Sequence, residues 1–179
     1  MMKKISLLFL VAIVFSPSIF AAPGLNMAMQ LRGTATGYDG TVPDIDGDGI
    51  DDPATCFDVE VFNVATGLKM GDGTDCLSNI TPVGGGLRIV GTTYFKLPSG
   101  TLVTRGITSV QPKTGGSESI THITGAIPGS GDNSVIAGDG AFKGVSGPVR
   151  LSGAVDMSQV DSGIISFDCL FIASLSKNK

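Results

Sequence analysis

The sequence of 179 residues contains no tryptophan, two tyrosines and a single histidine, and only 16% of its residues are charged. Sugar-binding proteins commonly stack their ligands on aromatic side chains, so the shortage of Trp and Tyr argues against a lectin. The one histidine, His122, has no accompanying Gly-x-Ser-x-Gly turn that would present a catalytic serine. A Ser-His-Asp hydrolase is therefore not expected. Zinc is not expected either, because the chain has no Cys-x-x-Cys spacing and no histidine beside a cysteine.

No stretch outside residues 1–21 repeats apolar residues with a helical period. Instead, short runs rich in Val, Ile, Thr and Phe alternate with turns rich in Gly, Pro and Ser. We expect strands at residues 27–36, 56–64, 68–80, 87–97, 101–110, 119–127, 134–137, 147–156 and 162–175. The main turns are expected at 65–67, 98–100, 112–117 and 128–133. The sequence therefore predicts an all-β domain, either a closed antiparallel barrel or a sandwich.

Residues 1–21 contain the longest apolar segment. Lys3 and Lys4 precede an apolar run at 5–15, and the small residues Ala21 and Ala22 end the segment. This order of charged, apolar and small residues is typical of a secretory signal peptide, with cleavage after Ala21. We therefore expect residues 22–179 to form a single domain in the periplasm or outside the cell.

Acidic residues outnumber basic ones, and the formal net charge is −4. Loss of Lys3 and Lys4 with the signal peptide takes it to −6, because residues 1–21 hold no Asp or Glu. An acidic chain with scattered Lys and Arg is poorly suited to nucleic acid or to anionic membrane surfaces. We expect neither as a partner.

The three cysteines, Cys56, Cys76 and Cys169, all lie in the expected mature domain. In an oxidising compartment two of them are expected to pair. Cys56 and Cys76 flank an expected hairpin, which makes their bridge the first choice. The other pairing is Cys56 with Cys169, which would join the first long strand to the last. Cys169 lies on an apolar alternation at 165–173, which favours a buried thiol.

An acidic loop lies at residues 39–55. From Asp44, it places carboxylates at positions 1, 3, 5 and 9 and a glycine at position 6, the spacing with which acidic loops bind Ca²⁺. The loop resembles the calcium loops of thrombospondin type 3 repeats. The expected ligands are Asp44, Asp46, Asp48, the backbone carbonyl of Ile50, and Asp52. Position 12 is Thr55 rather than a bidentate glutamate, so another group closes the shell or the affinity is modest.

A glycine-rich segment occupies residues 138–147 and reads Gly-Asp-Gly-Ala-Phe-Lys-Gly-Val-Ser-Gly. We expect Gly138 and Gly140 to adopt positive φ, and Phe142 to anchor the turn in the core. Gly144 and Gly147 are expected to allow close backbone approach. No helix or Lys-Ser/Thr pair is expected to follow, so the segment is not a phosphate-binding loop.

The same segment resembles the Gly-x-Gly-x-Phe-x-Gly-x-x-Gly turn of dirigent proteins and allene oxide cyclases. Residues 95–102, Phe-Lys-Leu-Pro-Ser-Gly-Thr-Leu, are similar to a strand–turn–strand hairpin of that superfamily. Residues 57–64, with Thr66-Gly67, are similar to its opening strand and turn. The resemblance covers about residues 56–175 and implies an eight-stranded antiparallel barrel that forms homo-oligomers, specifically trimers. A barrel of eight strands is just wide enough to hold one small ligand.

The resemblance also implies candidate catalytic residues. In the plant cyclases a glutamate, an ordered water and an apolar channel steer the ring closure of a fatty-acid epoxide, and dirigent proteins orient a reactive phenolic species. Glu60 is the residue most similar to the cyclase glutamate, with Asp58 as its partner on the same strand face. If that face points inward, the carboxyl group can serve as a general acid or base. If it points outward, both residues are solvated surface charges.

Two functions follow from these observations. In the first, the chain is an exported small-ligand-binding barrel, a cyclase, isomerase or stereochemical guide that acts on a hydrophobic or phenolic compound without a redox cofactor. In the second, it is a non-catalytic exported barrel, stabilised by calcium, that serves oligomerisation or partner binding. A lumen lined by carboxylates favours the first, and a lumen filled by Phe, Ile and Leu favours the second.

Overall fold

A computed structural model describes residues 25–112, 121–126 and 133–177 of the chain. The expected signal peptide lies outside the described residues, as do most of the expected turns at 112–117 and 128–133. The elements are β1 (Leu25–Thr36), β2 (Tyr38–Val42), β3 (Asp52–Asn63), β4 (Lys69–Val83), β5 (Gly86–Leu97), β6 (Gly100–Pro112), β7 (Thr121–Ala126), β8 (Ser134–Gly138), η1 (Gly140–Phe142), β9 (Val145–Ser146), β10 (Val149–Asp156), η2 (Val160–Ser162) and β11 (Ile164–Lys177). The expectation of an all-β domain is confirmed.

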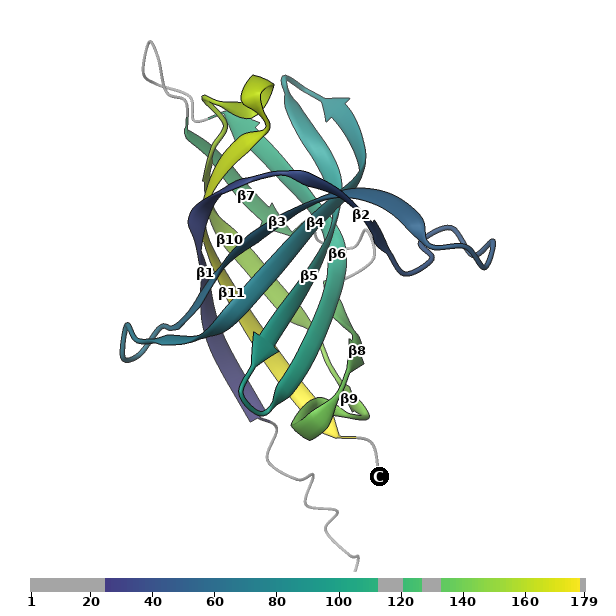
Figure 1. Cartoon of the computed structure of the whole chain (residues 1–179), viewed down its shortest axis with the longest axis vertical. Helices are drawn as coiled ribbons and strands as arrows, with labels where there is room; N and C mark the ends of the chain where they lie inside the picture. The colour runs from purple at the N-terminus through teal and green to yellow at the C-terminus, as the bar shows by residue number, and fades with distance from the viewer. Residues whose placement is uncertain (1–24, 113–120, 127–132, 178–179) are drawn as a thin grey trace, which may run out of the picture.

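The strands form one antiparallel sheet that returns on itself. Its order is β1-β11-β10-β7-β6-β5-β4-β3, and β3 pairs back to β1 at residues 29–32 to complete a ring of eight strands. β2 extends the sheet beyond β3, while β8 pairs with β6 and β9 pairs with β11. Figure 1 shows the ring, with β1 and β11 side by side along their length.

Each expected strand is present, with ends shifted by a few residues. Two short strands were not expected. β2 has the sequence Tyr-Asp-Gly-Thr-Val, which reads as a turn, and it forms a strand because β3 offers it an edge. β9 has only two residues and is held by the end of β11.

The core lies inside the ring and is built by alternation. On β11 the apolar residues Ile165, Phe167, Cys169 and Phe171 are all buried, as the sequence pattern predicted. Phe171 packs edge-on against Phe95 of β5, with ring centroids 5.1 Å apart. Burial of each such side chain contributes about 1.5–3 kcal/mol to folding, so the apolar face of β11 is a main source of stability.

The glycine-rich segment is a structural turn, but the glycines that adopt positive φ and those that allow close backbone approach differ from the expected ones. Gly140 and Gly144 have φ of 54° and 72°, while Gly138 has no positive φ. Gly138 provides close approach, since an added Cβ would lie 2.6 Å from the carbonyl oxygen of Phe142. Gly147 combines a positive φ of 144° with close backbone approach, since an added Cβ would lie only 2.0 Å from Ser174 O. Phe142 is buried in the core, as expected.

The disulfide joins Cys56 of β3 to Cys76 of β4, with the two Cα atoms 4.0 Å apart. This confirms the first choice of pairing and excludes the bridge from Cys56 to Cys169, which is a free buried thiol. The two bonded cysteines face outward from the ring, since Phe57 and Val59 next along β3 belong to the interior core. They form a second small cluster with Val42 and, at its margin, the partly buried Ile45 and Tyr94.

Residues 38–56, here called the β2–β3 arm, lie to one side of the ring (Figure 1). Within this arm, β2 and β3 continue as paired strands through residues 39–42 and 52–55, so the acidic loop is confined to 43–51. Arg105 of β6 anchors the loop: its guanidinium donates to the carbonyl oxygens of Pro43 and Asp44 and to the Thr92 hydroxyl.

None of the helices in the described part of the chain has the length and apolar character needed to cross a membrane. The disulfide is compatible with an exported protein, because disulfides persist in oxidising compartments.

Candidate functional site

Asp58 and Glu60 of β3 do not face the interior. Both are exposed, whereas Phe57, Val59 and Val61 between and beside them are buried. The strand therefore places the two carboxylates on the outer face. Of the two orientations that the sequence allowed, this is the outward one, in which both residues are solvated surface charges. They do not form a carboxylate lining of the lumen.

On the outer face these residues join polar networks. Glu60 Oε1 lies 2.8 Å from Lys69 Nζ, which lies at the same distance from Asp72 Oδ1. The hydrogen bonds that Lys69 donates to Asp72 and then to Glu60 raise its pKa above the usual value. Asp58 accepts a hydrogen bond from Thr74 at 2.6 Å. These exposed pairs contribute little to stability, since water screens them.

A different carboxyl group occupies the interior. Asp75 of β4 lines a cavity inside the ring, together with the apolar residues Leu77, Ile89, Val110, Leu151, Phe167 and Phe171. The space open to the centres of water molecules is about 50 Å³. A single water needs roughly 10–15 Å³ by this kind of measure, so the cavity holds a few waters or a very small molecule without rearrangement.

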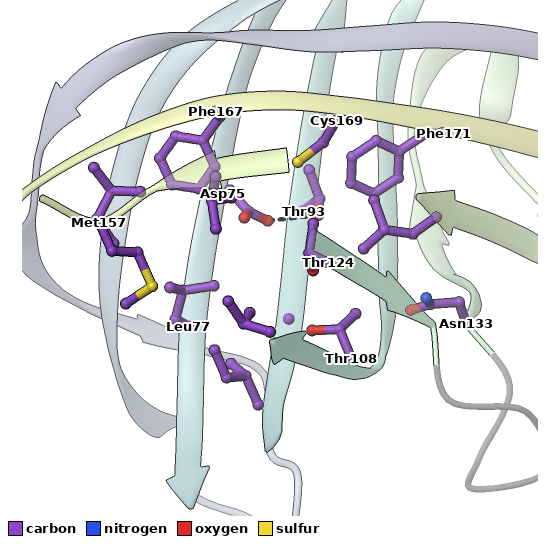
Figure 2. Close-up of a pocket in the computed structure, with 16 residues that line it drawn as sticks. Asp75, Leu77, Thr93, Thr108, Thr124, Asn133, Met157, Phe167, Cys169 and Phe171 are labelled. Carbon is purple, nitrogen blue, oxygen red and sulfur yellow. Dashed lines mark hydrogen bonds between the residues drawn. The ribbon is translucent and has the colours of Figure 1, made fainter. Parts of the chain in front are cut away.

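The register of the sheet explains why Asp75 points inward. It is opposite Phe57 on β3 and opposite Thr93 on β5, and side chains of directly opposed residues share one face. Its neighbour Cys76 faces outward in the disulfide, which leaves Asp75 to the interior. The Thr93 hydroxyl donates a hydrogen bond to Asp75 Oδ1 at 2.7 Å, drawn as a dashed line in Figure 2.

Burial raises the pKa of Asp75 from 3.8 to about 6, and the hydrogen bond from Thr93 opposes part of that shift. The side chain is partly buried and lines the cavity. Among the described residues that line the cavity, none is Lys, Arg or His, so the carboxylate has no counter-ion there. A group with a pKa near neutrality in such a place can accept or release a proton at physiological pH.

Asn133 brings a second polar group to the cavity wall (Figure 2). Its side chain lies over Gly106 of β6, where an added Cβ would be 1.5 Å from the amide oxygen. Its buried Nδ2 has no hydrogen-bond partner within the described part of the chain. Together with Thr108 and Thr124, it makes one side of the cavity polar, although most of the wall is apolar.

Cys169 also lines the cavity, and in Figure 2 its sulfur lies near Asp75. Burial, and then the charge of Asp75, raise the pKa of the thiol to about 12. A thiol in this state is a poor nucleophile, because the thiolate is the reactive form. Cys169 therefore forms part of the wall rather than a reactive centre.

Burial and the raised pKa of Cys169 predict that its thiol does not react in the folded protein. We expect no alkylation by iodoacetamide in the native protein and one alkylated thiol per chain after unfolding without reductant, because the other two cysteines are bonded. Intact mass measurement before and after unfolding checks both numbers. Alkylation of the native protein within minutes would contradict the buried position.

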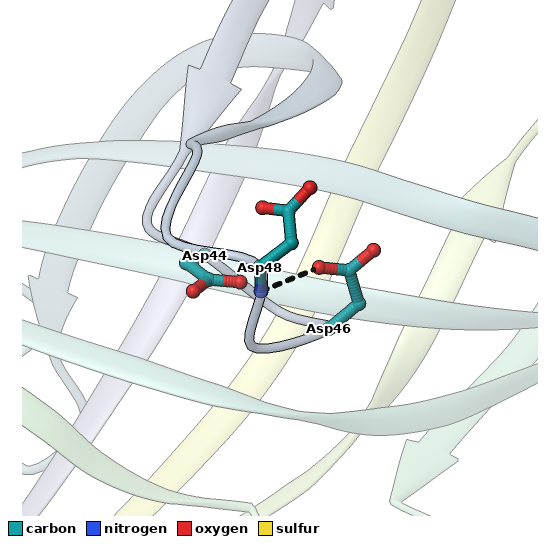
Figure 3. A group of neighbouring side chains, drawn as sticks. All are labelled: Asp44, Asp46 and Asp48. Atoms are coloured by element: carbon teal, nitrogen blue, oxygen red, sulfur yellow. Dashed lines mark hydrogen bonds between the residues drawn. The ribbon is translucent and has the colours of Figure 1, made fainter.

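The acidic loop gathers part of its expected ligand set. Asp44, Asp46 and Asp48 have carboxylate oxygens within 4.8 Å of one another (Figure 3). Backbone N–H groups of Gly49 and Gly47 hydrogen-bond to Asp44 and lower its pKa, so it is ionised at neutral pH. Asp52 is not part of this group; its carboxylate accepts a hydrogen bond from the Ile45 N–H. The glycines at 47 and 49 adopt φ of 86° and 87°, which the tight turn requires.

The sequence matches no family model and no curated protein. The interior cavity with its single carboxyl group, and the outer loop with three converging carboxylates, are therefore the features on which a function can be argued.

Proposed function

We propose that the protein is an exported eight-stranded β-barrel, of the allene oxide cyclase and dirigent type, that binds a small hydrophobic or phenolic molecule in its interior. Asp75, rather than Glu60 or Asp58, is the acid–base residue of this proposal. The observation that carries it is a carboxyl group with no counter-ion among the described residues that line an otherwise largely apolar cavity. Perturbed carboxyl groups in cavities are characteristic of functional sites.

The energetic argument supports this choice. A carboxylate without a counter-ion in an apolar interior lowers the stability of the fold, and so does the unpaired amide N–H of Asn133. Proteins retain such groups where they serve a ligand or a reaction. Proton exchange with a bound molecule at Asp75 needs no redox cofactor, which suits an isomerase or cyclase.

The size of the cavity limits the ligand or requires the wall to move. Typical pockets for small molecules measure about 300–1,000 Å³, far more than the space described here. Met157 lines the cavity, and its flexible, unbranched side chain is the part of the wall most able to rearrange. We expect a bound molecule to displace Met157.

A cavity-filling variant tests the proposal. Gly91 lines the cavity, and a Cβ added there would meet no atom within 4 Å. Gly91→Leu should fill the space and leave the ring intact. We expect native mass spectrometry to find an organic molecule on the wild-type protein taken from its own exported fraction, and none on Gly91→Leu.

The control is Gly91→Ala, which adds one methyl group and should keep part of the bound molecule. A wild-type protein that carries no organic molecule would count against ligand binding. If wild type and Gly91→Leu carry the same molecule, the ligand lies outside this cavity.

We also propose that the acidic loop binds one structural Ca²⁺ through Asp44, Asp46, Asp48, the carbonyl of Ile50 and Asp52. The support is the convergence of three carboxylates and the turn at Gly47 and Gly49. Since Arg105 connects this loop to β6, an ion there would stabilise the sheet as well as the loop.

Calcium is expected to raise the melting temperature. Binding to the folded state alone adds about 2.7 kcal/mol when the free ion is at 100 times its dissociation constant, a shift of roughly 5–10 °C for a domain of this size. Asp46→Ala combined with Asp48→Ala should abolish the shift. Scanning calorimetry with calcium and with a chelator measures it. A full response in the double variant would place the ion elsewhere.

A second function, a non-catalytic barrel for oligomerisation or partner binding, is favoured by the packing of the interior. A single apolar cluster that includes Met29, Leu31, Phe95 and Leu102 fills most of the ring. The same native mass spectra would distinguish this function, which predicts a bare oligomer, a trimer if the resemblance holds, that loses only calcium on chelation.

A further inference from the structure

The walls of the cavity specify more than an apolar ligand. Asp75 is the one charged residue among the described residues that line it, and Lys, Arg and His are absent from that set. The carboxylate of Asp75 has no counter-ion among the described residues of the wall, so it would repel an anionic ligand. A neutral ligand would leave the carboxylate unpaired, and the cost of burying it would remain.

Other parts of the wall favour a positive charge. The aromatic rings of Phe167 and Phe171 line the cavity, and their faces attract cations. The Asn133 side chain adds an amide oxygen over Gly106, and Thr108 and Thr124 add hydroxyl groups, all of which accept hydrogen bonds. An ammonium group has three N–H donors, which the Asp75 carboxylate and these oxygen atoms can accept; it offers no acceptor to Asn133 Nδ2, which has no partner among the described residues.

We propose that the molecule bound in the cavity is a small apolar amine, whose protonated nitrogen pairs with Asp75 and whose hydrocarbon part packs against Phe167, Phe171 and Leu77. This inference rests on the proposed ligand-binding function and adds the chemical class of the ligand. The amine supplies the counter-ion that the described wall lacks. Its binding also lowers the pKa of Asp75, because an adjacent positive charge favours the carboxylate.

Three probes of nearly equal size separate the possible ligand classes: isobutylamine, isobutanol and isobutyrate. Each has only five or six non-hydrogen atoms, which suits the small cavity, and the best-case efficiency for ligands of this size limits their affinity to the micromolar range. We expect ligand-observed NMR on the full mature protein at pH 7.5 to show isobutylamine binding at least about tenfold more tightly than isobutanol, a difference of about 1.4 kcal/mol. Isobutyrate should not bind.

Two variants test whether the preference for isobutylamine over isobutanol arises in the cavity. Asp75→Asn keeps the shape of the side chain and removes the charge, so it should reduce the preference for the amine over the alcohol to about one. Gly91→Leu should block both probes. Asp72→Asn, on the outer face of the same strand, is the matched control and should leave the preference unchanged.

The outcomes separate this inference from the proposed function. If isobutanol binds as tightly as isobutylamine and Gly91→Leu blocks both, the amine class is wrong and the ligand-binding cavity stands. If the preference persists in Asp75→Asn, the amine lies on the acidic surface and the inference is overturned. If no probe binds, the inference is also overturned, and the native mass spectra decide the ligand-binding function independently.

Discussion

Asp75→Asn is expected to stabilise the protein at neutral pH and to leave it nearly unchanged below pH 4. The pKa of Asp75 is about 6 in the folded protein against 3.8 for the free group, so the unfolded chain releases this proton first. Stability is therefore lost as pH rises from about 4 to 6 and stays lost above that. The shift of about two pH units corresponds to about 3 kcal/mol, or roughly 10 °C in melting temperature.

Thermal unfolding of both proteins from pH 3.5 to 8 measures this effect. The two curves should meet at acidic pH and separate as pH rises. Other carboxylates titrate alike in both proteins and cancel in the difference. Asp72→Asn is the control, because Asp72 is exposed on the outer face of the same strand. Parallel curves for wild type and Asp75→Asn would show that the carboxyl group is not buried in the fold.

Replacing both Cys56 and Cys76 by alanine is expected to lower the melting temperature by about 10 °C. The bridge closes a loop with a sequence separation of 20 residues, and cross-links of this length stabilise proteins by about 3 kcal/mol. The β2–β3 arm should loosen as well, since the bridge is the centre of the cluster that includes Val42 and Ile45.

Reductant provides the matched control for that variant. It should lower the melting temperature of the wild type to about that of the double variant, and it should not affect the double variant, whose remaining thiol is the buried Cys169. Hydrogen exchange should show faster exchange of amides in β2 than in β5. A change below about 2 °C would mean that packing of the arm, rather than the bridge, holds it in place.

The strongest strands could be predicted from the sequence because burial on one face imposes alternation. β11 alternates from Ile165 to Ala173, and its buried face follows that pattern. The hairpin of β5 and β6 turns at Pro98 and Ser99, as the Leu-Pro-Ser-Gly sequence indicates. β2 could not be predicted, because a five-residue edge strand has no alternation of its own and exists through pairing with β3.

The interior carboxyl group was missed because the expected strand at 68–80 has no apolar alternation around Asp75 that would show which of its faces is buried. Gly73 lies within β4 at a position where bulky neighbours leave no room for a side chain: an added Cβ would lie 2.5 Å from Leu31 Cδ1. The available signal was the disulfide. Once Cys56 and Cys76 are paired across antiparallel strands on the outer face, their neighbours Phe57 and Asp75 must both point inward.

Glu60 was a candidate catalytic residue because of the resemblance, but that role required its face of β3 to point inward. Alternation of Phe57, Val59 and Val61 with charged residues defines two faces and favours the apolar one as the covered face, which places Glu60 outside. The buried face proved to be the apolar one, as is usual for antiparallel sheets with one face in water.

The pairing that closes the ring has a consequence for how the chain acquires its structure. β1 pairs with β11 from Leu25 opposite Leu175 to Thr36 opposite Ile164, so two of the most distant segments of the sequence are neighbours. The hairpins from β3 to β6 can form from local contacts, whereas closure has to await the last strand. Folding dominated by such distant contacts is slow, and until closure the open edge of β1 is exposed to other chains. We therefore expect refolding yield to fall as protein concentration rises, with β1 as the segment that mediates the loss.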